Sequence, residues 1–552
     1  MKRWITTWAA LGMLVGLFSS AVAAGEGPPV LAPGETAIVR VYYPNAAMGR
    51  KIFISFEAQM LETDAGKGCH VMRVTREDVD RLTAAGLRVV VNKTWSPALP
   101  EAPTAYETET GIPHYPCYRT VEETFATAAQ LAADFPQLVE WIDVGDSWDK
   151  DAGIGGFDML VLRLTNENIE ADKPVLFLTA AMHAREYATA ELVTRFGEYL
   201  VTNYGSDADV TWILDHHEIH LMLQTNPDGR KIAEDHTLWR KNTNADYCQA
   251  DADSRGADLN RNFTFNWNCC GGSSDDECNS TYHGPWDASE PEIQAVQAYM
   301  KAIFKDQRED DMTTPAPHDA TGIYIDVHSY SRLVLWPWGS TGESAPNATQ
   351  LQTLGRKFAY WNDYSPEQAI GLYPTDGTSD EHAYGTYGVA AYCFEIGTSF
   401  FQSCQSFENT ILPDNLPALL YAAKVVRTPY LTPSGPDSRD LSVGGNSVPA
   451  GQSVALAATI DDTRYKILKG GDENEPVQNI LAAEYYIDTP PWSGGAATPM
   501  DSVDGFDSPV ETVSAAIETG DLSQGRHIVY VRGKDADGNW GAFSALFLEV
   551  TE

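Results

Sequence analysis

The chain has 552 residues, more than a single hydrophobic core usually organises, so we expect two or three folded units. Apolar residues make up 43% and charged residues 21% of the composition, which supplies packed cores and excludes a disordered chain. The 77 acidic residues outnumber the 38 Lys and Arg residues and give a net charge of -39, a field that repels phosphate backbones and disfavours nucleic-acid partners.

The first two dozen residues have the pattern of an export signal. Lys2 and Arg3 precede an apolar run that ends near Phe18, and small residues follow. We expect residues 1–24 to be a signal peptide, cleaved near Ala23 or Ala24. No later stretch reaches the ~20 apolar residues of a spanning helix. The sequence therefore predicts no membrane span and a secreted, periplasmic or extracellular protein.

Changes of pattern divide the rest of the chain into three parts. Residues 25–105 contain short β-rich runs and one helical pattern, which predicts a small α+β unit that ends in a linker rich in Pro, Thr and Glu. Residues 106–432 alternate apolar strands with helical patterns, which predicts an α/β unit with a mixed central sheet between helices. Residues 433–552 contain short alternating strands separated by Gly, Asp, Asn and Pro turns, which predicts a β-sandwich.

The eight cysteines fit an oxidising compartment and suggest disulfides. Four of them lie close together in a Gly-, Asn- and Ser-rich stretch, at Cys248, Cys269, Cys270 and Cys278. A structural zinc knot is the alternative for this cluster, although it lacks paired CxxC motifs. By elimination from the cluster, we expect Cys69 to pair with Cys117, which would tether the N-terminal unit to the next one.

Two separate strand ends carry candidate metal ligands. The apolar run 175–180 leads into His183 and Glu186, which are three positions apart at a strand-to-helix turn and can point at one ion. His328 follows a second apolar run, 323–327. Because strand ends in an open α/β sheet border the ligand crevice, these residues can converge although they are distant in sequence. Two His, one Glu and an open fourth position make a catalytic zinc site.

A competing set of histidines lies between these strands. His216 and His220 have the i, i+4 spacing of helical zinc enzymes, and His217 lies beside them. However, apolar residues alternate around His220 as in a strand, where positions four apart are separated by roughly 13 Å, too far for one ion. We therefore interpret these histidines as part of a strand surface.

Several motifs in a fixed order resemble the zinc metallocarboxypeptidases of the carboxypeptidase A/B family. His183-Ala184-Arg185-Glu186 and His328-Ser329-Tyr330-Ser331 match the two ligand motifs. Between them lie Trp239-Arg240-Lys241 and Asp258-Leu259-Asn260-Arg261-Asn262, and Tyr373 precedes Glu395 at the family's separation. The resemblance covers residues from about 118 to 429, and the ordered set is highly specific.

This resemblance implies a catalytic role for five residues. His183, Glu186 and His328 would bind one Zn²⁺ per catalytic domain. Glu395 would take a proton from the attacking water and pass it to the leaving nitrogen, as a general base and then acid. Arg240 would stabilise the oxyanion of the tetrahedral intermediate, a task that suits a permanently charged guanidinium.

The resemblance also implies how the substrate is held. Asn260 and Arg261 would bind the terminal carboxylate, with help from Arg185, and Tyr373 would close over the substrate. Asp380 aligns with the floor of the specificity pocket and resembles carboxypeptidase B, which suggests a preference for basic C-terminal residues. His382 and Cys393 depart from the family pattern in this region.

The resulting expectation is a secreted, monomeric zinc carboxypeptidase that hydrolyses the C-terminal bond of peptides or proteins. One alternative is a zinc amidopeptidase for cell-wall peptides, which has less reason to keep Asn260 and Arg261. Another is a non-catalytic peptide-binding protein, which would be expected to have lost Glu395 or a ligand. Residues 25–105 resemble carboxypeptidase propeptides, with an accessory domain as the alternative, and residues 433–552 resemble Ig-like or fibronectin-like modules.

Overall fold

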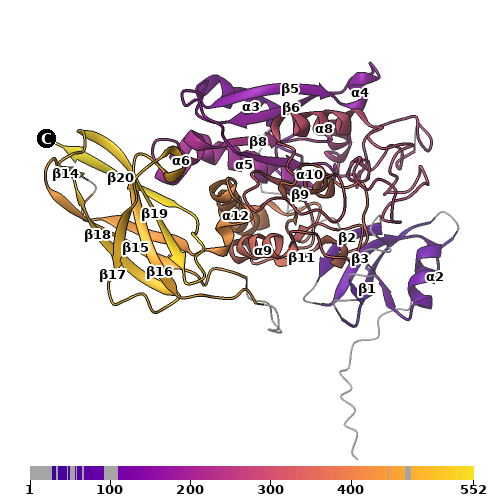
Figure 1. Cartoon of the computed structure of the whole chain (residues 1–552). Coiled ribbons are helices and arrows are strands. Elements are labelled where there is room, and N and C mark those ends of the chain that lie inside the picture. The colour runs from indigo at the N-terminus through magenta and orange to yellow at the C-terminus, as the bar shows by residue number, and fades with distance from the viewer. Residues whose placement is uncertain are drawn as a thin grey trace, which may run out of the picture.

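The computed structural model describes most of the chain and contains three sheets that follow one another in sequence (Figure 1). The described residues are 28–92 without 33–34, 46–47, 50–51, 53–55, 57–58 and 65–66, and then 110–250, 252–445, 447–466 and 474–552. The expected signal peptide and most of the expected linker lie outside these residues. Within the described ranges, no helix combines the length and the apolar character that crossing a bilayer requires.

The N-terminal unit is an antiparallel sheet with one helix against it. The sheet has the order β2-β3-β1-β4 and consists of β1 (Ala37–Tyr42), β2 (Met60–Asp64), β3 (Cys69–Val74) and β4 (Arg88–Val91). The helix α2 (Arg76–Ala84) joins β3 to β4, and Thr75 begins it in a capping box with Asp78. Val79 and Leu82 of α2 are buried in one core with the sheet. This is the α+β arrangement that the sequence predicts.

A mixed eight-stranded sheet forms the centre of the molecule, in the order β11-β10-β12-β9-β7-β8-β6-β5. Its strands are β5 (Val139–Asp146), β6 (Asp158–Leu164), β7 (Val175–Ala180), β8 (Glu218–Met222), β9 (Ile323–His328), β10 (Leu333–Trp336), β11 (Ser365–Gln368) and β12 (Ala390–Glu395). The neighbours β12, β9, β7 and β8 run parallel. Strands β7 and β9 are buried along their whole length, as in parallel sheets covered on both faces.

Helices cover both faces of this sheet. They are α3 (Val121–Asp134), α4 (Trp148–Asp151), α5 (Tyr187–Asn203), α6 (Ala208–His216), α7 (Pro227–Ala233), α8 (Pro291–Ile303), α9 (Ala348–Asn362), α10 (Ser379–Tyr387), α11 (Cys404–Ser406) and α12 (Leu412–Val425). On one face, α5 lies so close that a Cβ on Gly197 would be 2.9 Å from Leu221 of β8. On the other, the rings of Phe177 in β7 and Tyr299 in α8 are 5.6 Å apart. The predicted α/β fold class is confirmed.

Three neighbouring strands of this sheet end at the same edge. In the sheet register, Glu395 at the end of β12 pairs with His328 at the end of β9, and Ala180 at the end of β7 pairs with Val327. The carboxyl ends of parallel strands border the ligand crevice in open α/β sheets. The backbone therefore brings residues from distant parts of the sequence to one place.

The competing histidines lie away from this edge. His216 ends α6, and His220 lies in β8, so only His220 is in the expected strand. The expected surface location of His220 is wrong, because only 1% of the surface of this residue is exposed. Its ring lies 2.7 Å from the Tyr299 hydroxyl and 3.0 Å from a Glu218 carboxylate oxygen. The reason is that α8 covers this face of the sheet.

The C-terminal unit is the β-sandwich that the sequence predicts. Its strands are β13 (Asp437–Val443), β14 (Ser447–Pro449), β15 (Ser453–Asp461), β16 (Ile480–Ile487), β17 (Thr498–Ser502), β18 (Val510–Glu518), β19 (Gly525–Asp535) and β20 (Ser544–Thr551). Strand β17 pairs with both β16 and β18 and so connects the two layers. Leu456, Val513 and Val529 are fully buried in the core between them.

Three disulfides join six of the eight cysteines, which confirms that the chain contains disulfides. They are Cys117–Cys404, Cys248–Cys278 and Cys269–Cys270. The expected pairing of Cys69 with Cys117 is wrong. Cys69 is buried in β3 of the N-terminal sheet, whereas the Cα atoms of Cys117 and Cys404 are 5.5 Å apart, within the usual range for a disulfide.

Candidate metal centre and substrate cavity

Two candidate ligands lie in the short connection between a strand and a helix. β7 ends at Ala180, α5 begins at Tyr187, and Glu186 is the N-cap residue of α5. His183 lies in the turn between them. His328 is the last residue of β9, which is the neighbour of β7 in the sheet. The strand ends therefore set the relative positions of all three candidate ligands.

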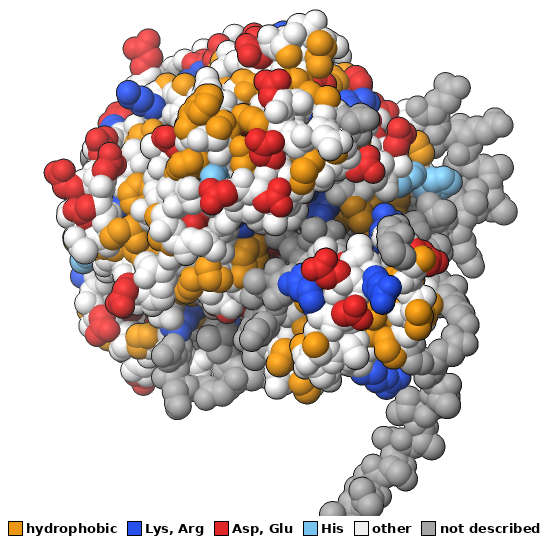
Figure 2. Space-filling model, turned by 90° about the vertical axis from the view of Figure 1, so that its right-hand side faces the viewer, with side chains coloured by type: hydrophobic (Ala, Val, Ile, Leu, Met, Phe, Trp, Pro, Cys, Tyr) orange, Lys and Arg blue, Asp and Glu red, His pale blue; other side chains and the backbone are white. Residues whose placement is uncertain are grey.

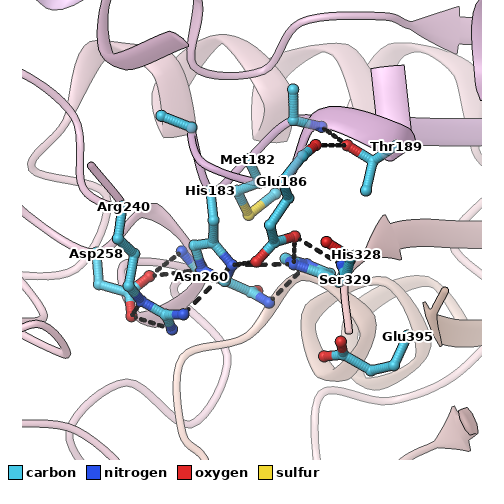
Figure 3. Close-up of polar contacts among 12 residues, drawn as sticks. Met182, His183, Glu186, Thr189, Arg240, Asp258, Asn260, His328, Ser329 and Glu395 are labelled. Atoms are coloured by element: carbon cyan, nitrogen blue, oxygen red, sulfur yellow. Dashed lines mark hydrogen bonds and ion pairs between the residues drawn. The ribbon is translucent and has the colours of Figure 1, made fainter. Parts of the chain in front are cut away.

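The three side chains converge on one buried space (Figure 3). His183, Glu186 and His328 are 4%, 1% and 1% exposed, and one ligand atom from each lies within 4.8 Å of the others. The two Nδ1 atoms are 3.0 Å apart. Each also faces a Glu186 oxygen, at 2.8 Å for His183 and 3.2 Å for His328. This His2Glu donor set has the composition of a catalytic zinc site.

Carboxylates hold the far side of each imidazole. His183 Nε2 lies 3.1 Å from Asp258 Oδ1, and His328 Nε2 lies 2.8 Å from Asp326 Oδ2. The Glu186 carboxylate also accepts a hydrogen bond from the Ser329 N–H at 2.9 Å. Such partners fix the orientation of a ligand and direct its remaining atom at the metal. The donor atoms are thus oriented by contacts outside the cluster.

Two carboxyl groups at the cluster stay ionised although they are buried. Burial acts to raise the pKa of Glu186, but His183 and His328 hold this pKa far below its usual range. Burial likewise acts on Asp258, yet Arg240 and His183 keep its pKa well below the usual value. Both carboxyl groups are therefore ionised, as a metal ligand and the partner of a ligating imidazole must be. The donor types and their convergence fit a zinc ion.

One cavity joins these ligands to most of the substrate residues expected from the sequence. It is lined by His183, Asn260, Arg261, His328, Tyr373, Asp380 and Glu395, with Leu335 and Leu372 among its apolar wall residues. Glu395 ends β12 beside His328, as Figure 3 also shows. A possible proton acceptor, a guanidinium and the ligand cluster therefore face the same space.

The short 3-10 helix η2 (Leu259–Arg261) carries both residues of the expected carboxylate clamp. The Asn260 side chain accepts a hydrogen bond from the Ser379 N–H at 2.9 Å, and its amide nitrogen is 3.1 Å from His328 Nε2. Arg261 donates from Nη1 to the Asn260 carbonyl at 2.7 Å. Its guanidinium carbon lies 5.7 Å from the centre of the Tyr373 ring. The expected clamp and the expected cap are therefore neighbours.

The other two arginines lie together in a different cavity. Arg240 donates from Nη2 to Asp258 Oδ2 at 2.8 Å, and its Nη1 is 3.5 Å from His183 Nδ1. Arg185 lies over the Phe400 ring, 4.0 Å from its centre, and lines the second cavity with Arg240. Arg240 is thus beside the metal ligands, whereas Arg185 is outside the cavity that contains Arg261.

The expected specificity residue is buried in the first cavity. Asp380 in α10 is 4% exposed, and its Oδ2 atom has no hydrogen-bond partner among the described residues. Burial raises the pKa of this carboxyl group, and the nearby charge of Asp326 raises it further. Cys393 lines the same cavity, and burial raises its thiol pKa well above the usual value. A buried acid and a thiol thus occupy the pocket together.

Asp258 and Asp326 belong to the site although the sequence analysis assigned them no role. A signal existed for both. Asp258 stands in the same motif as Asn260 and Arg261, and Asp326 is the only charged residue in the otherwise apolar run before His328. A carboxylate in a fully buried strand is costly unless it has a partner, so its position two residues before a candidate ligand indicates a supporting contact.

Comparison with known proteins agrees with this geometry. The profile of the zinc carboxypeptidase family, Peptidase M14, matches residues 125–415. The zinc carboxypeptidase of Saccharothrix mutabilis subsp. capreolus is 30% identical over 302 residues, which are 51% of this chain and 62% of that protein. Carboxypeptidase B of Astacus astacus is 31% identical over 305 residues, which are 54% of this chain and 91% of that protein.

The fold has a counterpart among solved structures. Carboxypeptidase A from Helicoverpa armigera superposes with a TM-score of 0.56 at 20% sequence identity, over 70% of this chain and 97% of that one. The first curated relatives are matched over 60–63% of their own length. The family profile, however, spans more than half of this chain. The chain therefore belongs to the zinc carboxypeptidase family.

Proposed function

We propose that this protein is a zinc-dependent carboxypeptidase that hydrolyses the C-terminal bond of peptides or proteins. One observation carries the proposal: the buried cluster of His183, Glu186 and His328 borders the same cavity as Glu395 and Arg261. A metal site alone would fit many hydrolases. The Arg261 guanidinium lies in the same cavity, and a guanidinium can bind the terminal carboxylate of a peptide. This group distinguishes a carboxypeptidase from other metal-dependent hydrolases.

In this proposal, His183, Glu186 and His328 hold the zinc ion, which polarises the scissile carbonyl and activates water when bound. Asp258 and Asp326 keep the two imidazoles in orientation. Glu395 accepts the proton of the attacking water and delivers it to the leaving nitrogen. Its place at the end of β12, next to His328, supports this role.

Arg240 and Arg261 have distinct tasks. Arg240 is fixed by Asp258 beside His183, so its guanidinium supplies positive charge where an oxyanion develops. Arg261 binds the terminal carboxylate with Asn260, and Tyr373 covers the bound residue. The location of Arg185 next to Arg240 supports contact with the substrate chain before the scissile bond rather than with its terminus.

Asp380 supports a preference for C-terminal Lys or Arg. A buried carboxyl group whose Oδ2 atom lacks a hydrogen-bond partner among the described residues is costly, and a cationic substrate side chain would supply the partner. Cys393 lines the same pocket. We include this preference in the proposal.

The N-terminal unit is proposed to cover the cavity as a propeptide does. Its buried core includes Tyr330 and Phe400 of the central unit, and Tyr373 packs against that core. The Thr63 hydroxyl also lies 3.4 Å from the Tyr330 hydroxyl. In Figure 2 the unit forms a lobe at the lower right, against the larger central unit. Substrate access would then increase when the connection near residue 105 is cut.

We also propose export from the cytoplasm, with cleavage near Ala23 or Ala24. The three disulfides support an oxidising compartment. Exposed disulfides such as Cys269–Cys270 would be reduced in a cytosol. N-terminal sequencing of the protein recovered from the culture medium and the periplasm tests this proposal directly, because a mature chain that still begins at Met1 would contradict it.

Hydrolysis of paired dipeptides tests the catalytic proposal. The purified protein, with and without limited proteolysis of its N-terminal connection, is given blocked dipeptides that end in a free carboxylate or in an amide. We expect cleavage of the free acids only, loss of cleavage with a chelator, and recovery with Zn²⁺. Cleavage of the amide forms, or of cell-wall peptides alone, would favour the amidopeptidase. Tight binding of zinc and peptide without hydrolysis would favour the non-catalytic alternative.

A further inference from the structure

A loop beside the proposed carboxylate clamp contains a crosslink between adjacent residues. Cys269 and Cys270 form a disulfide, and both residues are exposed. The loop continues through Gly272, which lies next to the segment between Tyr373 and Asp380. None of the catalytic roles described above uses this loop. Its contacts, however, lead to two parts of the substrate cavity.

The first contact of this loop is with Arg261. The Gly272 carbonyl accepts a hydrogen bond from Arg261 Nε at 3.0 Å. Together with the Asn260 carbonyl, which accepts from Nη1, it holds the guanidinium by two of its nitrogen atoms. Backbone acceptors of this kind fix the plane of the guanidinium. The loop therefore helps to set the direction in which Arg261 points.

The second contact is with the segment that follows Tyr373. Asp376 is fully buried, and its Oδ2 atom accepts hydrogen bonds from the Cys270 N–H at 3.1 Å and the Gly272 N–H at 2.9 Å. The approach is close, because a Cβ on Gly272 would lie 2.3 Å from the Thr375 carbonyl carbon. A single carboxylate oxygen thus joins the crosslinked loop to the segment that carries Tyr373.

We propose that the Cys269–Cys270 loop and Asp376 are positioning elements for the carboxylate clamp. The inference rests on the proposed carboxypeptidase function and on the role of Arg261 in it. A disulfide between neighbouring residues restricts the backbone of both, so the Cys270 and Gly272 N–H groups stay directed at Asp376. The Gly272 carbonyl is then held in place for Arg261. Opening the disulfide, or removing the carboxylate, releases both contacts together.

The effect is on affinity rather than on chemistry. The metal ligands and Glu395 lie after β7 and at the ends of β9 and β12, whereas the contacts of the loop are with Arg261 and Asp376. A looser Arg261 binds the terminal carboxylate less well in both the ground and the transition state. Such uniform loss of binding raises KM and leaves kcat nearly unchanged.

Two variants and two matched controls test the inference. Cys269→Ser combined with Cys270→Ser removes the crosslink, and Asp376→Ala removes the acceptor. Asp376→Asn keeps an oxygen that can accept both N–H groups, so it should largely rescue the function. Asp275→Ala removes an exposed carboxylate of the same loop that contacts His283 and the Asn268 amide rather than Asp376 or Arg261. For a dipeptide with a free carboxylate, we expect KM to rise about fivefold in the first two variants, the equivalent of one lost hydrogen bond, with kcat within about twofold.

Hydrogen–deuterium exchange provides a readout that does not depend on activity. In the zinc-loaded protein, the amides of residues 270–272 and 376–380 should exchange faster in the two variants and at the wild-type rate in Asp275→Ala. The inference is overturned if KM and exchange stay at wild-type values in both variants, or if Asp376→Asn behaves like Asp376→Ala. A wild-type protein that cleaves no free-acid dipeptide would refute the proposed function instead, and the exchange data alone would then decide the inference.

Discussion

The metal end and the substrate end of the cavity are held in place by different means. At the metal end, Glu186, His328 and Glu395 stand at the ends or starts of regular elements, and the sheet register fixes their relative positions. At the substrate end, Arg261 lies in a single helical turn, and Asp376 lies in an irregular segment. There, individual hydrogen bonds between loops determine the geometry.

This difference predicts which changes of geometry the protein tolerates. A shift at the metal end requires movement of a buried strand, and this would disturb the core of the central unit. A change at the substrate end involves a loop contact and leaves the sheet intact. Substrate preference can therefore vary within one fold while the metal chemistry stays constant, which agrees with the location of functional variation in loops.

The largest effect is expected from removing a metal ligand. His328→Ala should abolish stoichiometric zinc binding and reduce hydrolysis to the background, because two donors do not hold a catalytic ion. Metal analysis and dipeptide hydrolysis measure the two results, and circular dichroism checks the fold. Asp380→Ala is the control, because it should keep its zinc. A zinc-loaded, active His328→Ala protein would contradict the assignment of the metal end.

Glu395→Gln should separate metal binding from catalysis. The amide has nearly the shape of the carboxylate but cannot accept the proton of water, so kcat should fall by about 10²- to 10⁴-fold, the usual contribution of a general base. Zinc content and the inhibition constant of the product amino acid should remain within about twofold of wild type. Wild-type kcat in this variant would mean that another group at the metal end takes the proton.

Asp326→Asn tests whether supports outside the ligand set matter at the metal end. Asp326 contacts His328 Nε2 and also accepts a hydrogen bond from Thr179 at 2.8 Å, so the amide should fit the same space. We expect zinc affinity to fall by about 10- to 100-fold. Competition with a chromophoric chelator measures it. Unchanged affinity would show that the strand alone orients His328.

At the substrate end, Asp380→Asn should change preference without loss of metal. The ratio of kcat/KM for Lys-terminated over Phe-terminated dipeptides should fall by about tenfold, since a charge-assisted contact is worth about 1.5–3 kcal/mol. The value for the Phe substrate should change little. Parallel progress curves with both substrates measure this ratio. An equal ratio before and after the substitution would remove Asp380 from the specificity pocket.

The residues of the metal end could be predicted from the sequence because they lie at the ends of regular, buried elements. His328 directly follows one buried apolar run, and His183 and Glu186 lie in the turn that follows another. Short continuous apolar runs of this kind predict buried strands, so the pattern places all three residues at or just after strand ends. The resemblance to carboxypeptidases then supplied Glu395, which local pattern alone would not have connected to His328. The fold class followed from the alternation of strands and helices.

The substrate end and the disulfides depended on contacts between distant segments. No local pattern indicates that Gly272 contacts Arg261, or that Asp376 accepts from Cys270. The elimination argument assumed that the four clustered cysteines pair among themselves, and they do. It failed among the remaining cysteines, because Cys404 and not Cys69 lies next to Cys117 in the folded chain. Arg185 shows the same limit, because only the fold separates its cavity from that of Arg261.

Two buried carboxyl groups, Glu290 and Glu292, are linked to the segment that carries Asp258. Substitution of Glu292 is expected to have the smallest effect of the changes considered. The Asn242 amide donates to Glu290 at 2.7 Å and to Glu292 at 3.2 Å, and its oxygen accepts from the Ala257 N–H, next to Asp258. Burial and the negative charge of Glu290 raise the pKa of Glu292 to about 8. This pair of carboxyl groups should therefore respond to pH.

Because the pKa of Glu292 is higher in the folded protein than in the unfolded chain, its protonated form stabilises the fold below about pH 4.5. That contribution is lost progressively as the pH rises to about 8. Glu292→Gln mimics the protonated form at every pH. The melting temperature of the variant minus that of wild type should therefore increase by a few degrees from pH 5 to pH 8. Thermal unfolding of both zinc-loaded proteins measures the difference. A constant difference across this range would mean that Glu292 is ionised in the folded protein throughout it.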